Sequence, residues 1–392
     1  AGPYAASLLG DLGANVIKIE RAEGDWSRTA GKLGVGNVGS TQFVALNRNK
    51  RDISLDLGTP DGLRIIERMV EKSDVLLSNF RAGVMAKLGL GYARCKALRP
   101  DIVYCTISGL GQDGAYAQFP ASDTVLQALS GLMQQVGTAD GPPLRVGFPL
   151  IDLSAANNAV QGILAALYGR LSGKNGNGGA EIDVSLMASA MALMNVTFTD
   201  YLAGGRLPQR HGNQNPQHAP AGAYETAGRR YITLAILRDA HWKKLCAALD
   251  MPALADDARF SNNALRVANR TALDALIAPL FKAKTAEHWI AQLRAADILC
   301  GAVNTFADVM ADDGLAAGLP LIDGGIDGVP RMMGNPLRVN GEYFGNARSA
   351  PARGEHTREV LAEFGFSATE VESFLRSGSA LDRKSTRLNS SH

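Results

Sequence analysis

The residue best placed to do chemistry is one acid, Asp152, at the start of a long segment of small residues. It lies in the stretch VGFPLIDLSAANNAVQG, between an apolar run and a pattern typical of a helix. Backbone N–H groups and the helix dipole favour a carboxylate at a helix start, and the same groups can hold an oxyanion. A covalent carboxylate nucleophile and a plain helix cap both fit this local pattern.

A glycine-rich motif at residues 109–114 (GLGQDG) matches the GxGxxG pattern of dinucleotide-binding proteins. That fingerprint must also open a helix, with an acid about 20 residues further on. Here AYAQFPAS follows, with Pro120 close behind, which indicates a loop. We therefore interpret the motif as a glycine-rich turn, either of an active site or purely structural, rather than as a nicotinamide site.

The histidines and cysteines suggest neither a triad nor a metal site. His211 and His218 flank a Gly/Asn/Gln-rich segment and could line a pocket, whereas the other histidines are interpreted as structural or belong to the terminal tail. The four cysteines form no CxxC pair, which is typical of reduced thiols rather than of a disulfide scaffold or zinc site. They are Cys95, Cys105, Cys246 and Cys300.

Composition restricts the class of protein. The chain has 392 residues, 46% hydrophobic and 20% charged, with a formal net charge of +2. These values favour a soluble globular protein, and they indicate neither a nucleic-acid partner nor a membrane partner. We expect a cytoplasmic location. The opening run of residues 1–20 already has the pattern of a helix and a strand, so we expect further residues before it; residues 382–392 (DRKSTRLNSSH) are interpreted as a non-native tail.

Helix and strand signals alternate along the first part of the chain. Strands are predicted at residues 16–19, 53–57, 75–77, 102–106 and 182–184, and helices at 4–12, from Pro60 onward and at about 157–171. This alternation predicts a mostly parallel sheet covered by helices. A loop-like stretch at 204–223 precedes a smaller, mainly helical region, and strand signals return at 319–322 and 337–339 before a final helix near residue 355.

Several motifs occur together in one order along the chain. They are AGPYAASLLGDLGANVIKIE, the Asn49-Lys50-Arg51 segment, SNFRAGVMAKLGLGY, ISGLGQDGAYA, FPLIDLSAANNAVQGILAALY, EIDVSLMASAMALM, GNQNPQHAPAGAY and GEHTREVLAEFG. In this set the sequence resembles the class III CoA-transferases, the formyl-CoA and carnitine CoA-transferase type, a family that also includes acyl-CoA racemases. The resemblance extends from Ala1 to about Arg376.

The resemblance implies a family III CoA-transferase fold, with a Rossmann-like large domain and a smaller α+β domain. The expected divisions are residues 1–203 (large domain, its first strand missing), 204–310 (small domain with its linker), 311–381 (return to the large domain) and 382–392 (tail). It implies acyl-CoA and a carboxylic acid as substrates, no tightly bound cofactor, no metal, and an interlocked homodimer. It also implies a mobile glycine-rich loop over the active site, whose nearest counterpart is 212–222.

The resemblance places specific residues in the site. Asp152 falls on the catalytic aspartate, which forms an anhydride with the acyl group and then a thioester with CoA. The CoA-lining positions are Arg21, Leu55, Asn79, Phe80 and Lys87, with Arg81 nearby. Cations and a flat apolar face suit the phosphates and adenine of CoA. Taken alone, Arg21 and Lys87 could equally be surface charges, and Phe80 could be a core residue.

Two alternative functions remain. A racemase needs a second acid/base, usually a His, and Ser122 occupies that position here. A non-catalytic acyl-CoA-binding protein is the other alternative, although simple binding gives no reason for the acid at 152. Gly58 departs from relatives that carry a lysine beside CoA. The sequence leaves the pair of acids open.

Overall fold

The computed structural model describes residues 1–173, 178–344 and 348–383. The chain divides into two compact units, each with its own core. Unit 1 comprises residues 1–130, 146–202 and 319–392, and unit 2 comprises 131–145 and 203–318. Residues 131–145 thus group with unit 2, whereas the sequence placed them in the large domain, and the return to unit 1 begins at Leu319 rather than at 311.

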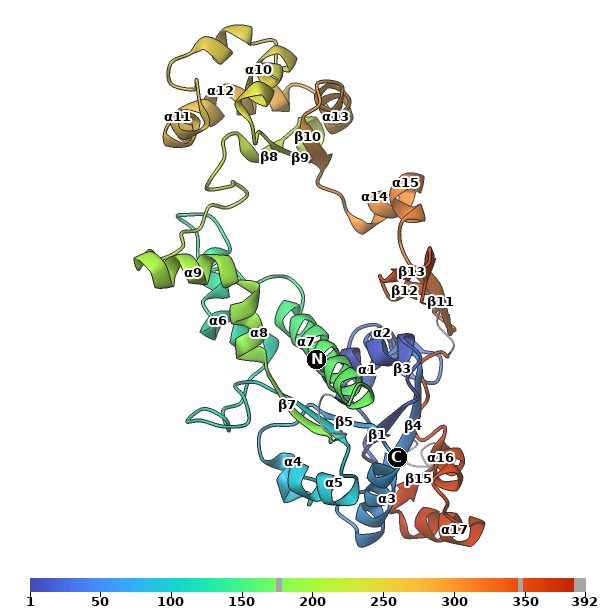
Figure 1. Ribbon diagram of the computed structural model, residues 1–392. Helices are drawn as coiled ribbons and strands as arrows, with labels where there is room; N and C mark the ends of the chain where they lie inside the picture. Colours follow the sequence, from blue (N-terminus) through green and yellow to red (C-terminus); the bar gives the residue numbers. More distant parts are fainter. Residues whose placement is uncertain (174–177, 345–347, 384–392) are drawn as a thin grey trace. The chain divides into compact units, whose positions relative to one another are not determined.

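Unit 1 is a mixed α/β structure (Figure 1). One sheet has the order β5-β6-β7, with all pairs parallel, and a second has the order β1-β4-β15, with β1 and β4 parallel and β15 antiparallel. Their bounds are β1 (Val16–Glu20), β4 (Lys50–Leu55), β5 (Val75–Ser78), β6 (Val103–Ser108), β7 (Ala180–Ser185) and β15 (Ala380–Leu381). The predicted parallel strands are therefore present, one or a few residues from their expected bounds.

Strand β6 shows why the helices lie on both faces of the β5-β6-β7 sheet. All six of its residues are buried. Val103, Cys105 and Ile107 belong to the core cluster of α1 (Gly2–Asp11) and α7 (Leu150–Leu171), whereas Tyr104 belongs to the cluster of α3 (Pro60–Glu71) and the C-terminal helices. Alternate side chains of a strand point to opposite faces, so a strand covered on both sides is apolar throughout.

Local signals fix the helix starts. In α3, the Thr59 side chain accepts the N–H of Gly62, with Pro60 as the first helical residue, as the sequence predicts. Helix α7 starts at Leu150 directly after Pro149, seven residues before its predicted start at 157. The other helices of unit 1 are α2 (Thr41–Asn47), α4 (Val84–Lys87), α5 (Tyr92–Leu98), α6 (Asp123–Leu129), α8 (Leu186–Leu193), α9 (Asn195–Gly204), α16 (Thr357–Glu363) and α17 (Ala368–Ser377), with the 3-10 turn η1 (Trp26–Thr29).

Among the described residues, α7 is the one helix long and apolar enough to cross a membrane, judged by length and composition alone. Core helices of soluble proteins share these properties. Ala155, Ala159 and Ile163 of α7 are fully buried in the core cluster that α7 forms with α1, α8 and β6. One side of α7 therefore packs within unit 1, while Leu164 and Leu171 are exposed.

Smaller two-stranded sheets complete unit 1. They are β2 (Leu33–Val35) with β3 (Gly39–Ser40), β11 (Leu321–Ile326) with β12 (Val329–Met333), and β13 (Arg338–Val339) with β14 (Glu342–Tyr343). Strand β15 pairs with β4, and the buried Asp382 accepts a hydrogen bond from Arg358 at 2.8 Å. Asp382 therefore belongs to the fold rather than to the non-native tail assigned from the sequence; residues 384–392 lie outside the described residues.

Unit 2 combines an antiparallel sheet with a helical layer. The sheet order is β8-β9-β10. Its elements are β8 (Ala221–Glu225), β9 (Tyr231–Ala235), β10 (Leu299–Ala302), α10 (Asp239–Ala248), α11 (Asn263–Ala268), α12 (Arg270–Lys282), α13 (Ala286–Ala295), α14 (Phe306–Ala311) and α15 (Asp313–Ala317), with short 3-10 turns η2 (Leu132–Gln135), η3 (Ala227–Arg229) and η4 (Pro252–Asp256). Trp242, Phe281 and Trp289 form the centre of its core.

Candidate active site

Asp152 lies in the first turn of α7, where its side chain is 33% exposed. One carboxylate oxygen, Oδ1, is 3.6 Å from the amino nitrogen of Ala1, which is the N-cap residue of α1. In a chain with residues before Ala1, the same nitrogen is an uncharged peptide N–H. The carboxylate is therefore half-buried where the starts of two helices meet, and it keeps a path to solvent.

The surroundings of Asp152 make it a more basic carboxylate than a free aspartate. Burial raises the pKa of the Asp152 carboxyl; the Ala1 ammonium opposes this increase, and the nearby Asp123 carboxylate adds to it. A desolvated carboxylate with a raised pKa is a better nucleophile toward a carbonyl carbon than a solvated one.

Asp123 is a site residue that sequence reasoning missed. It begins α6 and is buried, and its Oδ2 accepts the N–H groups of Ile151 at 2.8 Å and Asp152 at 3.1 Å. Its Oδ1 accepts from Nε2 of the buried Gln127 at 2.6 Å, and Oε1 of Gln127 accepts the N–H of Val146 at 2.8 Å. The Asp123–Gln127 pair thus holds the segment that enters α7.

These contacts correct one sequence-based expectation. The start of α7 was expected to offer free N–H groups to an oxyanion, but the N–H groups of residues 150–153 all have partners. Those of Ile151 and Asp152 bind Asp123, while Leu150 and Leu153 donate to the carbonyls of Phe148 and Pro149. The donor that faces the Asp152 carboxylate is instead the nitrogen of Ala1.

The predicted CoA residue Asn79 lies at the same corner of unit 1. It follows β5, its Nδ2 donates to the Ile107 carbonyl at 3.0 Å, and its Oδ1 accepts the Gly2 N–H at 2.9 Å. Asn79 therefore fixes the start of α1, whose first nitrogen faces Asp152. Phe80 comes next and is 51% exposed, so it presents a ring to solvent rather than to the core.

The other predicted CoA residues differ in exposure. Arg21 is highly exposed beside Glu23 at 3.4 Å, and its carbonyl accepts from Ser54 of β4 at 3.4 Å. Lys87 ends α4 and is exposed, and Arg81 is exposed as well. Leu55 is the exception, because its side chain is 1% exposed within the core cluster of α3 and α17. The Leu55 side chain packs in the core, and a contact of this position with CoA stays a prediction.

The glycine motif at residues 109–114 lies in a loop after β6, and no helix begins before Asp123. Gly111 has a φ of +95°, and a Cβ on Gly109 would lie 2.4 Å from the Cβ of Ala121. Ala121 lies two residues before Asp123 in the chain, and close packing against it requires glycine at 109. Ser122, the position of a racemase base, is exposed as the N-cap of α6.

The segment 212–222, predicted to be a mobile active-site loop, is anchored within unit 2 by four polar residues of α11 and α12. Asn263 binds the Ala219 N–H at 3.2 Å and the Gln217 carbonyl at 2.8 Å. The fully buried Arg266 donates to the Ala219 carbonyl at 2.6 Å. Arg270 donates to the carbonyls of Asn215 and His218, and Asp274 accepts from Gln214.

Neither predicted histidine takes part in a described catalytic pair. His211 is exposed, and Nδ1 of His218 is buried without a hydrogen-bond partner. Across the described part of the chain, no group of three or more His, Cys, Asp and Glu side chains is arranged to hold a metal ion. The nitrogen that faces the Asp152 carboxylate is that of Ala1, at the start of α1.

Comparison with known proteins identifies the family. Residues 1–357 match the family model described as CoA-transferase family III. The chain is 38% identical over 367 residues to an acetyl-CoA:oxalate CoA-transferase of Acetobacter aceti, covering 93% of this chain and 92% of that protein. It is 34% identical over 375 residues to a succinate–glutarate CoA-transferase of Agrobacterium fabrum, with 93% and 92% covered.

A solved structure shares the fold. The crystal structure of a CAIB/BAIF family protein from Brucella suis superposes with a TM-score of 0.84 at 33% identity, covering 93% of this chain and 95% of that one. The half-buried aspartate in a mixed α/β unit is thus found in an enzyme of the CoA-transferase class. The chain belongs to CoA-transferase family III, as the sequence motifs suggested.

Proposed function

We propose that this enzyme transfers CoA from an acyl-CoA to a free carboxylic acid, with Asp152 as the covalent nucleophile. The observation that carries the proposal is the Asp152 carboxylate, half-buried, with a raised pKa, and facing the start of α1. The relatives named above transfer CoA between carboxylic acids, which supports the same reaction class here.

The steps balance without an external acid or base. An Asp152 oxygen attacks the thioester carbonyl, the C–S bond breaks, and CoA leaves as a thiolate with the bonding electrons, giving a mixed anhydride. The thiolate attacks Cγ of Asp152, which releases the donor carboxylate and forms an aspartyl-CoA thioester. The acceptor carboxylate then attacks Cγ and displaces the thiolate, which attacks the new acyl carbonyl and frees Asp152. No proton is transferred, so these steps require no catalytic histidine pair.

We propose small dicarboxylic acids as the first substrates to test. Oxalate, succinate and glutarate occur in the names of the relatives, and one sequence does not choose among them. Purified protein is incubated with acetyl-CoA or succinyl-CoA and a panel of free acids, and new thioesters are measured by mass spectrometry. Solvent exchange of the α-proton without a new thioester would instead indicate a racemase, and neither product would indicate binding alone.

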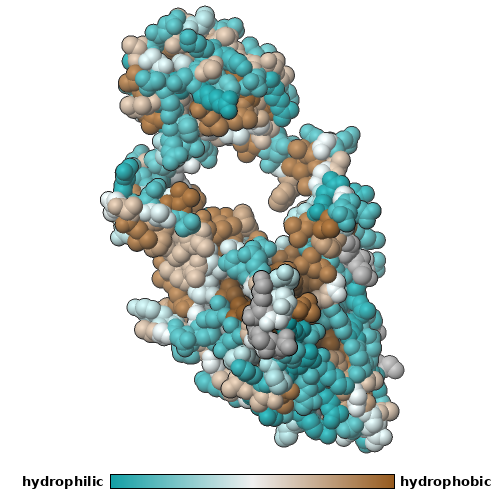
Figure 2. All heavy atoms as spheres, in the orientation of Figure 1, coloured by the Kyte–Doolittle hydropathy of each residue, from teal (hydrophilic) through white to brown (hydrophobic). Residues whose placement is uncertain are grey.

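We also propose a homodimer, interlocked as in the resembled family. Several large apolar side chains of α6, α8 and α9 are exposed, including Leu129, Leu193, Val196 and Leu202 at 47–72%. Figure 2 shows hydrophobic side chains gathered on the face of unit 1 that carries α8 and α9. Light scattering after chromatography should give twice the chain mass of 41.4 kDa, and Val196→Glu should shift it toward the monomer. A wild-type monomer contradicts the proposal.

A further inference from the structure

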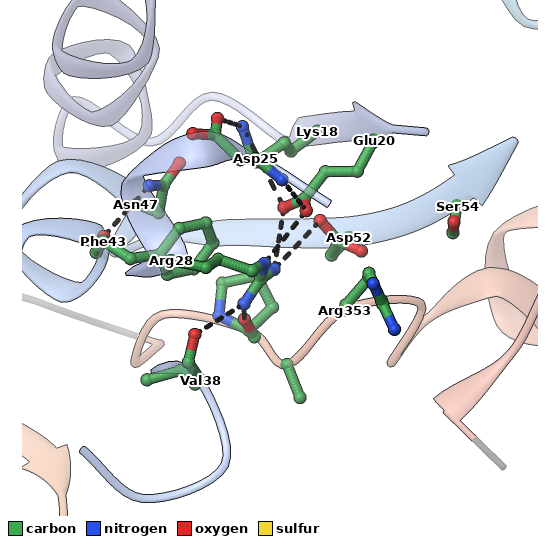
Figure 3. A network of polar contacts seen from close by, with 12 residues as sticks. Lys18, Glu20, Asp25, Arg28, Val38, Phe43, Asn47, Asp52, Ser54 and Arg353 are labelled. Atoms are coloured by element: carbon green, nitrogen blue, oxygen red, sulfur yellow. Dashed lines mark hydrogen bonds and ion pairs between the residues drawn. The ribbon is translucent and has the colours of Figure 1, made fainter. Parts of the chain in front are cut away.

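One arginine of η1, Arg28, is the centre of a buried polar network between β1, η1 and β4 in unit 1 (Figure 3). Its guanidinium forms a fork on the Glu20 carboxylate: Nη2 donates to Oε1 at 2.7 Å, and Nε donates to Oε2 at 2.9 Å. The side chain of Arg28 is 11% exposed and that of Glu20 is 1% exposed. Two parallel bonds between a guanidinium and a carboxylate fix the distance and the orientation of both groups.

The same guanidinium contacts four further segments of unit 1. Its Nη1 donates to the Val38 carbonyl between β2 and β3 at 2.9 Å, and to the Pro351 carbonyl at 3.2 Å. Its Cζ lies 3.6 Å from the ring centroid of the fully buried Phe43 of α2. Its Nη2 lies 3.6 Å from Oδ2 of Asp52 in β4. A lysine has one donor nitrogen and no planar face, so it cannot make these contacts together.

The Glu20 carboxylate connects the network to the turn that follows β1. Its Oε2 also accepts the Asp25 N–H at 2.8 Å, and the Gly24 N–H donates to the Arg21 carbonyl at 2.9 Å. Gly24 has a φ of +85°, and a Cβ there would lie 3.3 Å from Oε2 of Glu20 and 3.5 Å from Cδ of Arg28. The turn therefore packs directly against the ion pair.

The backbone of this turn is held, whereas one of its side chains extends into solvent. The Asp25 carboxylate binds Lys18 at 2.6 Å, and Arg353 donates to the Ala22 carbonyl at 2.7 Å. By contrast, the side chain of Arg21 is 79% exposed. A ligand at the surface can therefore reach the Arg21 guanidinium, whose place is set by the backbone beneath it.

We propose that Arg28 is a positioning residue for CoA binding. Its fork on Glu20 holds the turn that follows β1, and this turn presents the Arg21 guanidinium to the phosphates of CoA. Arg28 is buried, so it acts through Arg21. The inference rests on the proposed function, in which Arg21 contacts CoA. It predicts that a change of Arg28 loses its effect on CoA affinity once Arg21 has been removed.

The test is a double-mutant cycle, measured as the Kd of CoA by calorimetric titration. Arg21→Ala removes the proposed contact, and Arg28→Lys keeps the positive charge but cannot form the fork. Arg170→Lys is the matched control, because the Arg170 side chain is 17% exposed and binds two carboxylates and a carbonyl in the same unit. Its partners, Asp74 and Asp101, precede β5 and β6, at the opposite ends of these strands from the proposed site.

We expect Arg21→Ala and Arg28→Lys each to raise the Kd of CoA about tenfold, and Arg28→Lys to add less than about twofold in the Arg21→Ala background. Arg170→Lys should stay within about twofold of its parent in both backgrounds. In transfer assays, Arg28→Lys should raise the KM for acyl-CoA about tenfold and change kcat by less than about twofold, since lost binding contacts appear in KM. A purely structural role would lower the melting temperature without this split.

Glu20→Gln is the second variant, in case Arg28→Lys does not fold. Glutamine has one acceptor oxygen where glutamate has two, so either the Asp25 N–H or the guanidinium loses its partner. The bonds from Arg28 to the carbonyls of Val38 and Pro351 remain. We expect Glu20→Gln to behave like Arg28→Lys in the same cycle.

Three results would overturn the inference. Independent, multiplying losses of affinity in the double variant show that Arg28 does not act through Arg21. Unchanged CoA affinity in folded Arg28→Lys or Glu20→Gln removes the positioning role, and unchanged affinity in Arg21→Ala removes the contact that is positioned. These titrations need no turnover, so they remain decisive even if Asp152→Asn retains transfer and the proposed function fails.

Discussion

Replacing Asp123 should destabilise the fold and displace Asp152, the proposed nucleophile, because the Asp123 side chain holds the start of α7. Asp123→Ala leaves the N–H groups of Ile151 and Asp152 without their acceptor, as well as the amide of Gln127. An unpaired buried donor costs about 1–3 kcal/mol and a lost helix cap about 0.5–2 kcal/mol. Since water can reach part of this site, we expect a total loss of about 2–4 kcal/mol.

Asp123→Asn gives a finer test, because asparagine has one acceptor oxygen where aspartate has two. That oxygen can serve either the α7 N–H groups or Gln127, whose own carbonyl is already fixed by Val146. We expect a loss of about 1–2 kcal/mol. Displacing Asp152 by about 1 Å should also lower kcat, by up to about 100-fold.

The assay is urea unfolding of both variants, followed by circular dichroism, with transfer kinetics across pH. Asp123→Asn removes a negative charge that raises the pKa of Asp152, so the acid limb of its pH–rate profile should move to lower pH. Asp61→Asn, at a partly exposed first-turn acid of α3, is the control and should match the wild type. A stability loss below about 0.5 kcal/mol for Asp123→Ala would refute the reasoning.

Two further predictions concern other parts of the chain. Arg270→Ala removes the hydrogen bonds to the carbonyls of Asn215 and His218, so a protease should cleave the segment 214–219 faster while the global stability stays that of the wild type. Unchanged cleavage would show that Asn263 and Arg266 alone hold the segment in place. Burial and the Glu20 charge raise the pKa of Asp52 well above its usual value, so the stability that its protonated form contributes is present below the unfolded pKa and is lost as pH rises toward the folded pKa. In the wild type, the free energy of unfolding measured with urea should therefore fall by up to about 1.4 kcal/mol per pH unit in this range, and Asp52→Asn should lack this fall. Equal pH slopes in the wild type and the variant would contradict the prediction.

Much of the fold could be predicted from local patterns. The Thr59 cap and Pro60 at the start of α3, and the β-branched run of β1, act within a few residues, so the sequence reveals them directly. Helix α7 begins seven residues before the predicted range of about 157–171, although Asp152 was interpreted as lying near a helix start. Its start depends on Asp123, which is 28 residues away from Ile151.

The parts of the site that were missed depend on distant partners. Asp123 looks like a routine first-turn acid of α6, and only the folded chain shows that it caps a different helix. The burial of the Leu55 side chain likewise follows from α3 and α17 packing over β4, which the local sequence does not show. The helical spacing of the anchoring residues Asn263, Arg266 and Arg270 predicts that they share one polar face. It does not predict that this face binds the segment 212–222.

The most direct test of the central claim is intact-protein mass spectrometry after addition of an acyl-CoA, followed by peptide mapping. The account predicts a covalent CoA or acyl adduct on the peptide that contains Asp152, absent from Asp152→Asn, and discharged by an acceptor acid to give a new thioester. Full transfer activity in Asp152→Asn, or an adduct on another residue, would contradict it.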